Sequence, residues 1–181
     1  MTTMPVHSVP IPESSVLTAL EGAKHVRIMG CGFCDNWSFA YHRNRPIYEL
    51  KKEGDNTIRI PVALSQEANH YKNLLEAKGA ECDIEFVYQL CQISDDIDIH
   101  AMHGNAPWTQ SDWVDRCRGS DAVLSLGCSA ALVGLKKRLG DDVKVVPGLK
   151  TTGAIQLKTY LDESKRYIML DKEGSTVIEY K

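Results

Sequence analysis

The chain has 181 residues, of which 43% are hydrophobic and 25% are charged, and its formal net charge is −3. This composition is typical of a globular protein with enough residues for one domain around a hydrophobic core. The negative charge argues against a nucleic-acid partner bound by bulk positive charge, and no apolar run reaches the length of a transmembrane helix. The N-terminus lacks a signal-peptide pattern, so we expect a cytoplasmic protein without a membrane or nucleic-acid partner.

The first half of the chain is expected to alternate between helices and strands. Residues 1–12 contain many proline and polar residues, and we expect them to form a flexible lead-in to a single domain over 13–181. Apolar spacing and helix-ending glycines then predict five elements. They are a helix over 13–22, a strand over 25–30, a helix over 45–53, a strand over 57–64 and a helix over 65–78.

The second half continues this alternation around one long irregular stretch, residues 92–108. The predicted elements are strands over 83–90, 121–127 and 143–146, helices over 109–118 and 129–139, and two final strands over 167–171 and 175–180 joined by a turn at 172–174. Alternating strands and helices favour an α/β protein with a Rossmann-like layered fold. We expect a mostly parallel sheet flanked by helices, with a C-terminal β-hairpin.

Four cysteines follow the ends of three predicted strands. Cys31 and Cys34 form a C-x-x-C pair after the first strand, while Cys91 and Cys128 each follow a later one. Because ligands bind at the carboxyl ends of strands in open α/β sheets, we expect the four thiols to meet in one site. Such a site suits zinc or a [4Fe–4S] cluster, and the sequence does not separate the two.

Three glycines stand beside these cysteines: Gly30, Gly32 and Gly127. Having no side chains, they are expected to let backbone N–H groups approach the bound cofactor. Two other cysteines, Cys82 and Cys117, are expected to be small buried hydrophobic residues.

Other functions remain open at this point. Cys31 and Cys34 could form a thiol–disulfide pair, with Cys91 and Cys128 as unrelated buried cysteines. A zinc ion with an exchangeable ligand would instead make the chain an enzyme in its own right. The sequence assigns no role to three histidines, His42, His100 and His103.

Several segments that carry the cysteines resemble a known family. Residues 23–34, 90–91, 120–131 and 146–151 are similar to the methylenetetrahydrofolate reductase C-terminal domain family, which also occurs as a separate small subunit beside a flavin-containing reductase. The resemblance covers roughly residues 15–155 and includes all four cysteines in the family's order. It implies a zinc- or iron–sulfur-binding accessory subunit of a one-carbon or methyl-transfer enzyme system. Its partner would be a flavoprotein or a methyl-transfer enzyme, and its role electron transfer or bracing of the interface.

The chain departs from that family at two places. Family members often carry a further cysteine shortly after the C-x-x-C pair, where this chain has Ser38, and they commonly continue into a cysteine-rich tail, whereas residues 162–181 contain no cysteine. The resemblance therefore implies one metal or cluster site here rather than a relay of several.

Overall fold

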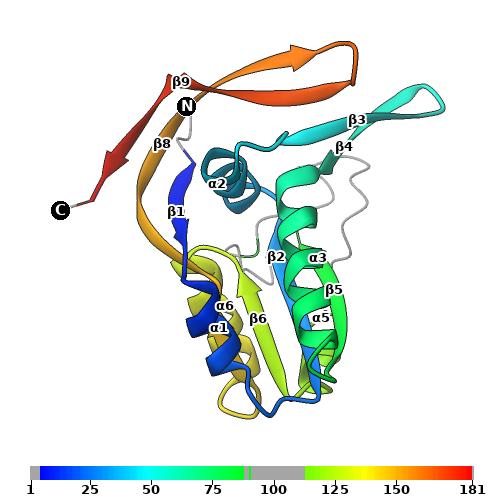
Figure 1. The fold of residues 1–181 in the computed structure, drawn as a ribbon, viewed down its shortest axis with the longest axis vertical. Coiled ribbons are helices and arrows are strands. Elements are labelled where there is room, and N and C mark those ends of the chain that lie inside the picture. Colours follow the sequence, from blue (N-terminus) through cyan, green and yellow to red (C-terminus); the bar gives the residue numbers. More distant parts are fainter. Residues whose placement is uncertain (1–4, 88–89, 91–112, 181) are drawn as a thin grey trace.

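A computed structural model of the protein describes residues 5–87, 90 and 113–180. These residues form a four-stranded sheet, a five-stranded sheet and the helices that pack on them (Figure 1). The chain is thus an α/β protein, as the sequence predicts. The expected mostly parallel sheet is only partly confirmed, because the larger sheet is antiparallel.

The parallel sheet has helices on both faces. Its strands, in the order β5-β2-β6-β7, are β5 (Glu81–Val87), β2 (His25–Cys31), β6 (Ala122–Leu126) and β7 (Lys144–Pro147). One face is covered by α1 (Glu13–Ala19), α2 (Cys34–Arg43) and α3 (Val62–Glu76), and the other by α5 (Trp113–Arg118) and α6 (Ser129–Leu139).

Alternation along β2 divides the core into two clusters. Val26 and Ile28 face α1, α2 and α3, whereas Met29 and Cys31 face α5 and α6. This period of two is the geometry of an extended strand, so both faces of a buried strand must be apolar.

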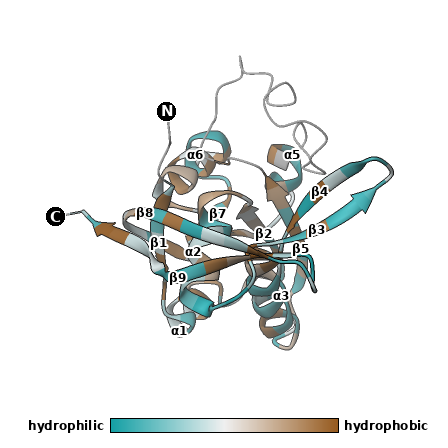
Figure 2. Cartoon of the chain, turned by 90° about the horizontal axis from the view of Figure 1, so that it is seen from above, coloured by the Kyte–Doolittle hydropathy of each residue, from teal (hydrophilic) through white to brown (hydrophobic). Residues whose placement is uncertain are grey.

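The antiparallel sheet joins segments from both ends of the chain. In the order β1-β8-β9-β3-β4, its strands are β1 (Val6–Pro10), β8 (Leu149–Asp162), β9 (Tyr167–Glu179), β3 (Tyr48–Glu53) and β4 (Asn56–Pro61). In Figure 1, β8 runs beside β1 and then arches with β9 past α2. The β3–β4 hairpin projects to one side and is mostly hydrophilic (Figure 2).

Two predictions in the N-terminal half are wrong. Residues 6–10 are not a flexible lead-in but strand β1, which pairs with β8. The predicted helix over 45–53 is largely strand β3, and a helix that the sequence analysis did not predict, α2, lies just before it. A tight turn explains the strand: Gly54 adopts a positive φ of 61°, which lets β3 fold back on β4.

A C-terminal hairpin is present, but its strands are not the predicted ones: the segments 167–171 and 175–180 fall along the single strand β9, whose partner β8 is not predicted. Residues 172–174 are not a turn but part of a bulge inside β9, where the pairing shifts between Gln156 and Lys158 of β8. The reversal lies between β8 and β9 instead, where Arg166 has a φ of 55°. The other predicted elements are present with ends that differ by up to three residues, and α6 agrees residue for residue. Parts of two predictions, residues 88–89 of the strand over 83–90 and residues 109–112 of the helix over 109–118, lie outside the described residues. The predicted irregular stretch over 92–108 lies outside the described residues.

The helices of the described segments include none that is long and apolar enough to cross a membrane.

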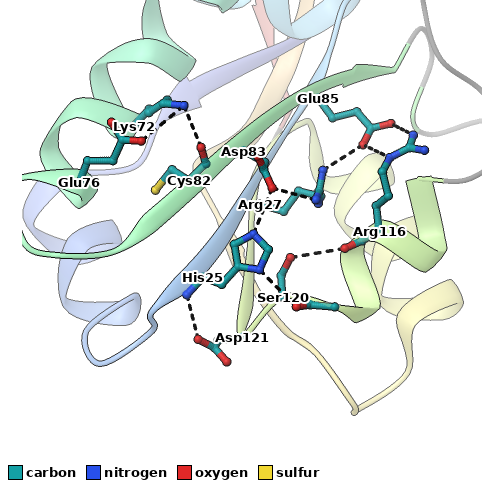
Figure 3. Close-up of polar contacts among 11 residues, drawn as sticks. His25, Arg27, Lys72, Glu76, Cys82, Asp83, Glu85, Arg116, Ser120 and Asp121 are labelled. Atoms are coloured by element: carbon teal, nitrogen blue, oxygen red, sulfur yellow. Dashed lines mark hydrogen bonds and ion pairs between the residues drawn. The ribbon is translucent and has the colours of Figure 1, made fainter.

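A chain of ion pairs crosses the face of the parallel sheet beside α5 (Figure 3). Asp83 accepts from both His25 and Arg27 at 3.0 Å, Arg27 continues to Glu85 at 3.5 Å, and Arg116 of α5 also pairs with Glu85. Glu85 is only 7% exposed, so these contacts satisfy a carboxylate that burial would otherwise destabilise.

His25 has an acceptor at each ring nitrogen. Its Nδ1 lies 3.2 Å from the Gly119 carbonyl and its Nε2 lies 3.0 Å from the Asp83 carboxylate. Only the doubly protonated ring can donate to both. The hydrogen bond to Asp83 accordingly raises the pKa of His25, and the same bond lowers the pKa of Asp83.

The two shifts define the pH range in which this pair stabilises the fold. The contribution of His25 is complete below its unfolded pKa of about 6.5 and is lost as the pH rises through its raised folded pKa. The contribution of Asp83 is present above its unfolded pKa of about 3.9 and is lost as the pH falls through its lowered folded pKa. The pair therefore stabilises the protein most between about pH 4 and pH 6.5.

We predict that Asp83→Asn moves the pKa of His25 down toward its ordinary value, because the charge-assisted hydrogen bond is removed. An NMR pH titration of the His25 ring measures this shift. Asp115→Asn, which removes an exposed partner of Arg118, is the matched control and should leave His25 unchanged. An identical His25 titration in Asp83→Asn and the wild type would contradict the assignment.

Candidate functional site

Three of the four predicted site cysteines lie at the carboxyl edge of the parallel sheet. Cys31 is the last residue of β2, Cys34 the first of α2, and Cys128 immediately precedes α6. Cys31 and Cys128 are buried in the same cluster between the sheet and α6. The fourth, Cys91, lies outside the described residues. Leu90 belongs to this cluster too. Its side chain packs close to Gly127, since a Cβ atom added at that glycine would lie 3.6 Å from it.

The strand order places Cys31 and Cys128 on either side of a topological switch point. From β2 the chain proceeds to β5 on one side, and from β6 it proceeds to β7 on the other. The connection from β2 to β5 includes α3, which covers one face of the sheet. The connection from β6 to β7 consists of α6, which covers the opposite face. In open α/β sheets the crevice at such a point is where ligands bind.

The turn between Cys31 and Cys34 is fixed by contacts on both sides. The Gly32 N–H donates to the Val87 carbonyl at 3.1 Å, and the Tyr48 hydroxyl donates to the Gly32 carbonyl at 3.1 Å. Trp37 in turn donates to the Tyr48 oxygen at 3.1 Å, and its ring packs against Phe33 with 4.6 Å between centroids. The C-x-x-C turn is therefore held before any ligand binds.

Asn36 ties α2 to the segments that flank β3 and β4. Its side-chain N–H donates to the Ile47 carbonyl at 2.7 Å, and its side-chain oxygen accepts from the Leu64 N–H at 2.9 Å. Asn36 is fully buried, so both ends of its amide are satisfied inside the protein.

Ser38 ties the first turn of α2 to β1. Its hydroxyl donates to the Cys34 carbonyl at 3.1 Å and accepts from the Ser8 N–H at 3.1 Å. Ser38 is fully buried and stands where the resembling family often has a cysteine. In this chain the position therefore contributes a structural hydrogen bond.

Asp35 is a buried carboxylate beside the cysteines. Neither of its oxygens has a hydrogen-bond partner of ordinary geometry among the described residues. Burial raises its pKa to about 7, although the Cys128 N–H and the Cys31 thiol lie close enough to lower it in part. A buried acid without a satisfied partner costs folding free energy.

Cys31 shares this environment. Burial, followed by the charges of Asp35 and Cys34, raises the pKa of its thiol well above the ordinary value, while the Phe33 and Leu90 N–H groups oppose the shift. A metal ion bound to the Cys31 sulfur would stabilise the thiolate and so reverse this shift. Thiolates are ligands that both zinc and iron accept.

The described part of the chain contains no group of three or more His, Cys, Asp or Glu side chains arranged to hold a metal ion. Cys31, Cys34 and Cys128 are among these described side chains and do not form such a group, while Cys91 lies outside the described residues. The four-cysteine set therefore stays a prediction.

The predicted cofactor-binding glycines have packing roles. A Cβ atom at Gly30 would lie 2.7 Å from Phe86, and one at Gly127 would lie 2.7 Å from Ala131. The Gly32 N–H is already bonded to Val87. Approach of these backbone groups to a cofactor stays a prediction.

The other singled-out residues lie away from the edge. Cys82 and Cys117 are buried, as expected, and burial raises the pKa of their thiols to about 11 and about 12. His42 lies in the last turn of α2, at the opposite end from Cys34. His100 and His103 lie outside the described residues.

Sequence analysis missed Asp35, Asn36 and Tyr48 as contributors to this region. The available signal was the run of polar residues after Cys34, which would have indicated a polar buried face had a helix been predicted there. One surface pocket of about 670 Å³ lies near the opposite end of the sheet, among residues 14–24 and 75–80, and includes none of these groups.

Comparisons with models of known families, with curated proteins and with solved structures give no match to this chain.

We predict that Asn36→Ala lowers the free energy of unfolding by about 2–4 kcal/mol, because it leaves the Ile47 carbonyl and the Leu64 N–H buried without a partner. Asn69→Ala is the matched control. Asn69 is exposed and bonds only to Ser65 of its own helix, so its loss should cost about 0.5 kcal/mol or less. Urea unfolding measures both values, and equal costs would refute the anchoring role of Asn36.

Proposed function

We propose that this chain is a metal- or iron–sulfur-binding accessory protein. Cys31, Cys34, Cys91 and Cys128 would hold a zinc ion or a [4Fe–4S] cluster at the carboxyl edge of the parallel sheet. One observation carries the proposal. Cys31 ends β2 and Cys128 follows β6, on either side of the switch point of the parallel sheet, and Cys34 lies three residues beyond Cys31.

The strand order supports the Rossmann-like part of the expected fold. Sheet order β5-β2-β6-β7 with helices on both faces fits a doubly wound arrangement, in which a ligand crevice would open between β2 and β6. The cysteines that end β2 and follow β6 would then reach one bound group from opposite sides of that crevice.

The residues around the cysteines would orient and shield the group. Tyr48 and Trp37 fix the C-x-x-C turn, while Phe33 and Leu90 supply backbone N–H groups toward the Cys31 sulfur. Zinc with four thiolates would brace this edge of the fold, and a cluster would carry single electrons.

The biological assignment rests on the family resemblance. By that resemblance the chain serves a one-carbon or methyl-transfer enzyme system in the cytoplasm, with a flavoprotein or methyl-transfer enzyme as its partner. Its contribution would be electron transfer or interface bracing rather than catalysis of its own.

A thiol–disulfide function is less compatible with the site. Redox-active C-x-x-C pairs depend on a first cysteine whose pKa is lowered. In this chain burial and the neighbouring acidic groups raise the pKa of Cys31. A stand-alone zinc enzyme would need an exchangeable ligand, which the cysteine variants below would reveal.

Metal and acid-labile sulfide analysis of anaerobically purified protein tests the proposal. About four irons with matching sulfide per chain would support electron transfer, and one zinc without sulfide would support bracing. Cys128→Ser should lower both the metal content and the stability, because metal binding free energy contributes to folding.

Cys82→Ser is the matched control, since Cys82 is buried at the opposite end of the parallel sheet. It should retain the metal even if it lowers stability. Wild-type protein that binds neither metal nor cluster, or Cys128→Ser protein with a full metal content, would refute the four-cysteine site.

A further inference from the structure

Two imidazole rings meet where β1 packs on α2. His7 belongs to β1 and His42 to the last turn of α2, and their ring centroids lie 5.0 Å apart with 35° between the ring planes. His7 is only 4% exposed. Tyr41 packs edge-on against both rings, with centroid distances of 5.6 Å to His7 and 5.5 Å to His42.

Each ring has one buried nitrogen without a hydrogen-bond partner. The Nε2 atoms of both rings are buried and have no partner among the described residues. The His7 Nδ1 lies 3.1 Å from the Thr152 hydroxyl, and the Ser8 backbone lies close enough to the His42 ring to raise its pKa in part.

This pattern is typical of metal-binding histidines. Such residues bind the ion through one ring nitrogen, while the other is oriented by a backbone carbonyl, a carboxylate or another polar group. Without a ligand, two neighbouring buried ring nitrogens that lack hydrogen-bond partners lower the stability of the fold. Burial also lowers the pKa of both rings, so both are neutral near pH 7 and retain the lone pair that a metal needs.

A bulge in β8 lies opposite His7. His7 pairs with Gly153 and Ser8 pairs with Thr151, so the extra residue, Thr152, is in β8. The hydroxyl of this extra residue lies 3.1 Å from the His7 Nδ1. On the same strand the Ser8 N–H donates to the Ser38 hydroxyl of α2, while the His7 ring packs against His42 at the end of that helix.

The surrounding charges are mixed and exposed. Glu179 raises the pKa of His7 in part, whereas Lys172 and Arg43 help to lower that of His42. The Lys172 ammonium lies 4.7 Å from the centre of the Tyr41 ring. All three charged residues are exposed to solvent, which screens them, and Glu179 supplies a carboxylate on the His7 side.

We propose that His7 and His42 bind a divalent transition-metal ion, such as Zn²⁺, through their Nε2 atoms, with water completing the coordination. This site lies at the opposite end of α2 from Cys34. It goes beyond the proposed function and does not depend on it, because no cysteine takes part.

The test uses the full chain as purified, with its metal content measured first, so that Zn²⁺ added beyond that content reports on this site whether or not the cysteines hold a metal. Long-range ¹H–¹⁵N NMR of the histidine rings follows each ring nitrogen during a Zn²⁺ titration. The Nε2 resonances of His7 and His42 should shift together and saturate at one equivalent. The rings of His25 and His70, which already pair with carboxylates, should change little.

Three variants locate the added ion. Competition with a chromophoric chelator should show Zn²⁺ binding weakened about tenfold or more in His7→Gln and His42→Gln. His70→Gln, which alters an exposed histidine, should bind as the wild type does. Cys128→Ser should keep this second equivalent even if it loses the first, which separates failure of this proposal from failure of the cysteine site.

Two results would overturn the proposal. One is a titration in which wild-type protein binds Zn²⁺ without a shift of both Nε2 resonances, or binds none at concentrations up to about 100 µM. The other is equal affinity in His42→Gln and wild type. If a histidine variant fails to fold, the NMR titration of the wild type decides alone.

Discussion

The placement of α2 between two sheets is the constraint on which the rest of the structure depends. Two buried polar side chains fix it: Asn36 bonds to the backbone at Ile47 and Leu64, and Ser38 bridges Cys34 to Ser8. Because these contacts lie on one helical turn and point to different neighbours, α2 cannot slide or rotate without leaving buried groups unsatisfied. Its position relative to both sheets follows from them.

Both candidate sites lie at the ends of this helix. Cys34 and Asp35 begin it at the switch point of the parallel sheet, and His42 lies in its last turn beside β1. Each end carries buried polar atoms that the described residues satisfy poorly, Asp35 at one and the Nε2 of His42 at the other. In the middle of the helix Asn36 and Ser38 are hydrogen-bonded, so the poorly satisfied groups lie where ligands would bind.

The sequence predicted the parallel sheet well because its signals are local. An apolar run followed by Cys128 and a helix that ends at Gly140 identifies β6 and α6 directly. The sequence analysis did not predict the antiparallel sheet, because its strands pair residues that are far apart in the chain, such as Val6 with Ala154. No local pattern encodes such a partner. The charged run over 51–53 likewise looked helical, although pairing with β4 makes it a strand. For the same reason the sequence analysis did not find the site at His7. His7 lies beside α2 only because β1 pairs with β8.

The bulged pairing of β1 with β8 also sets an order of assembly during synthesis. Val6 is made before every strand of the parallel sheet, whereas its partner Ala154 is made after all four of them. Contacts of such high sequence separation form late, because closing the intervening loop costs entropy first. Until β8 arrives, the edge of β1 and the ring of His7 are exposed in the nascent chain.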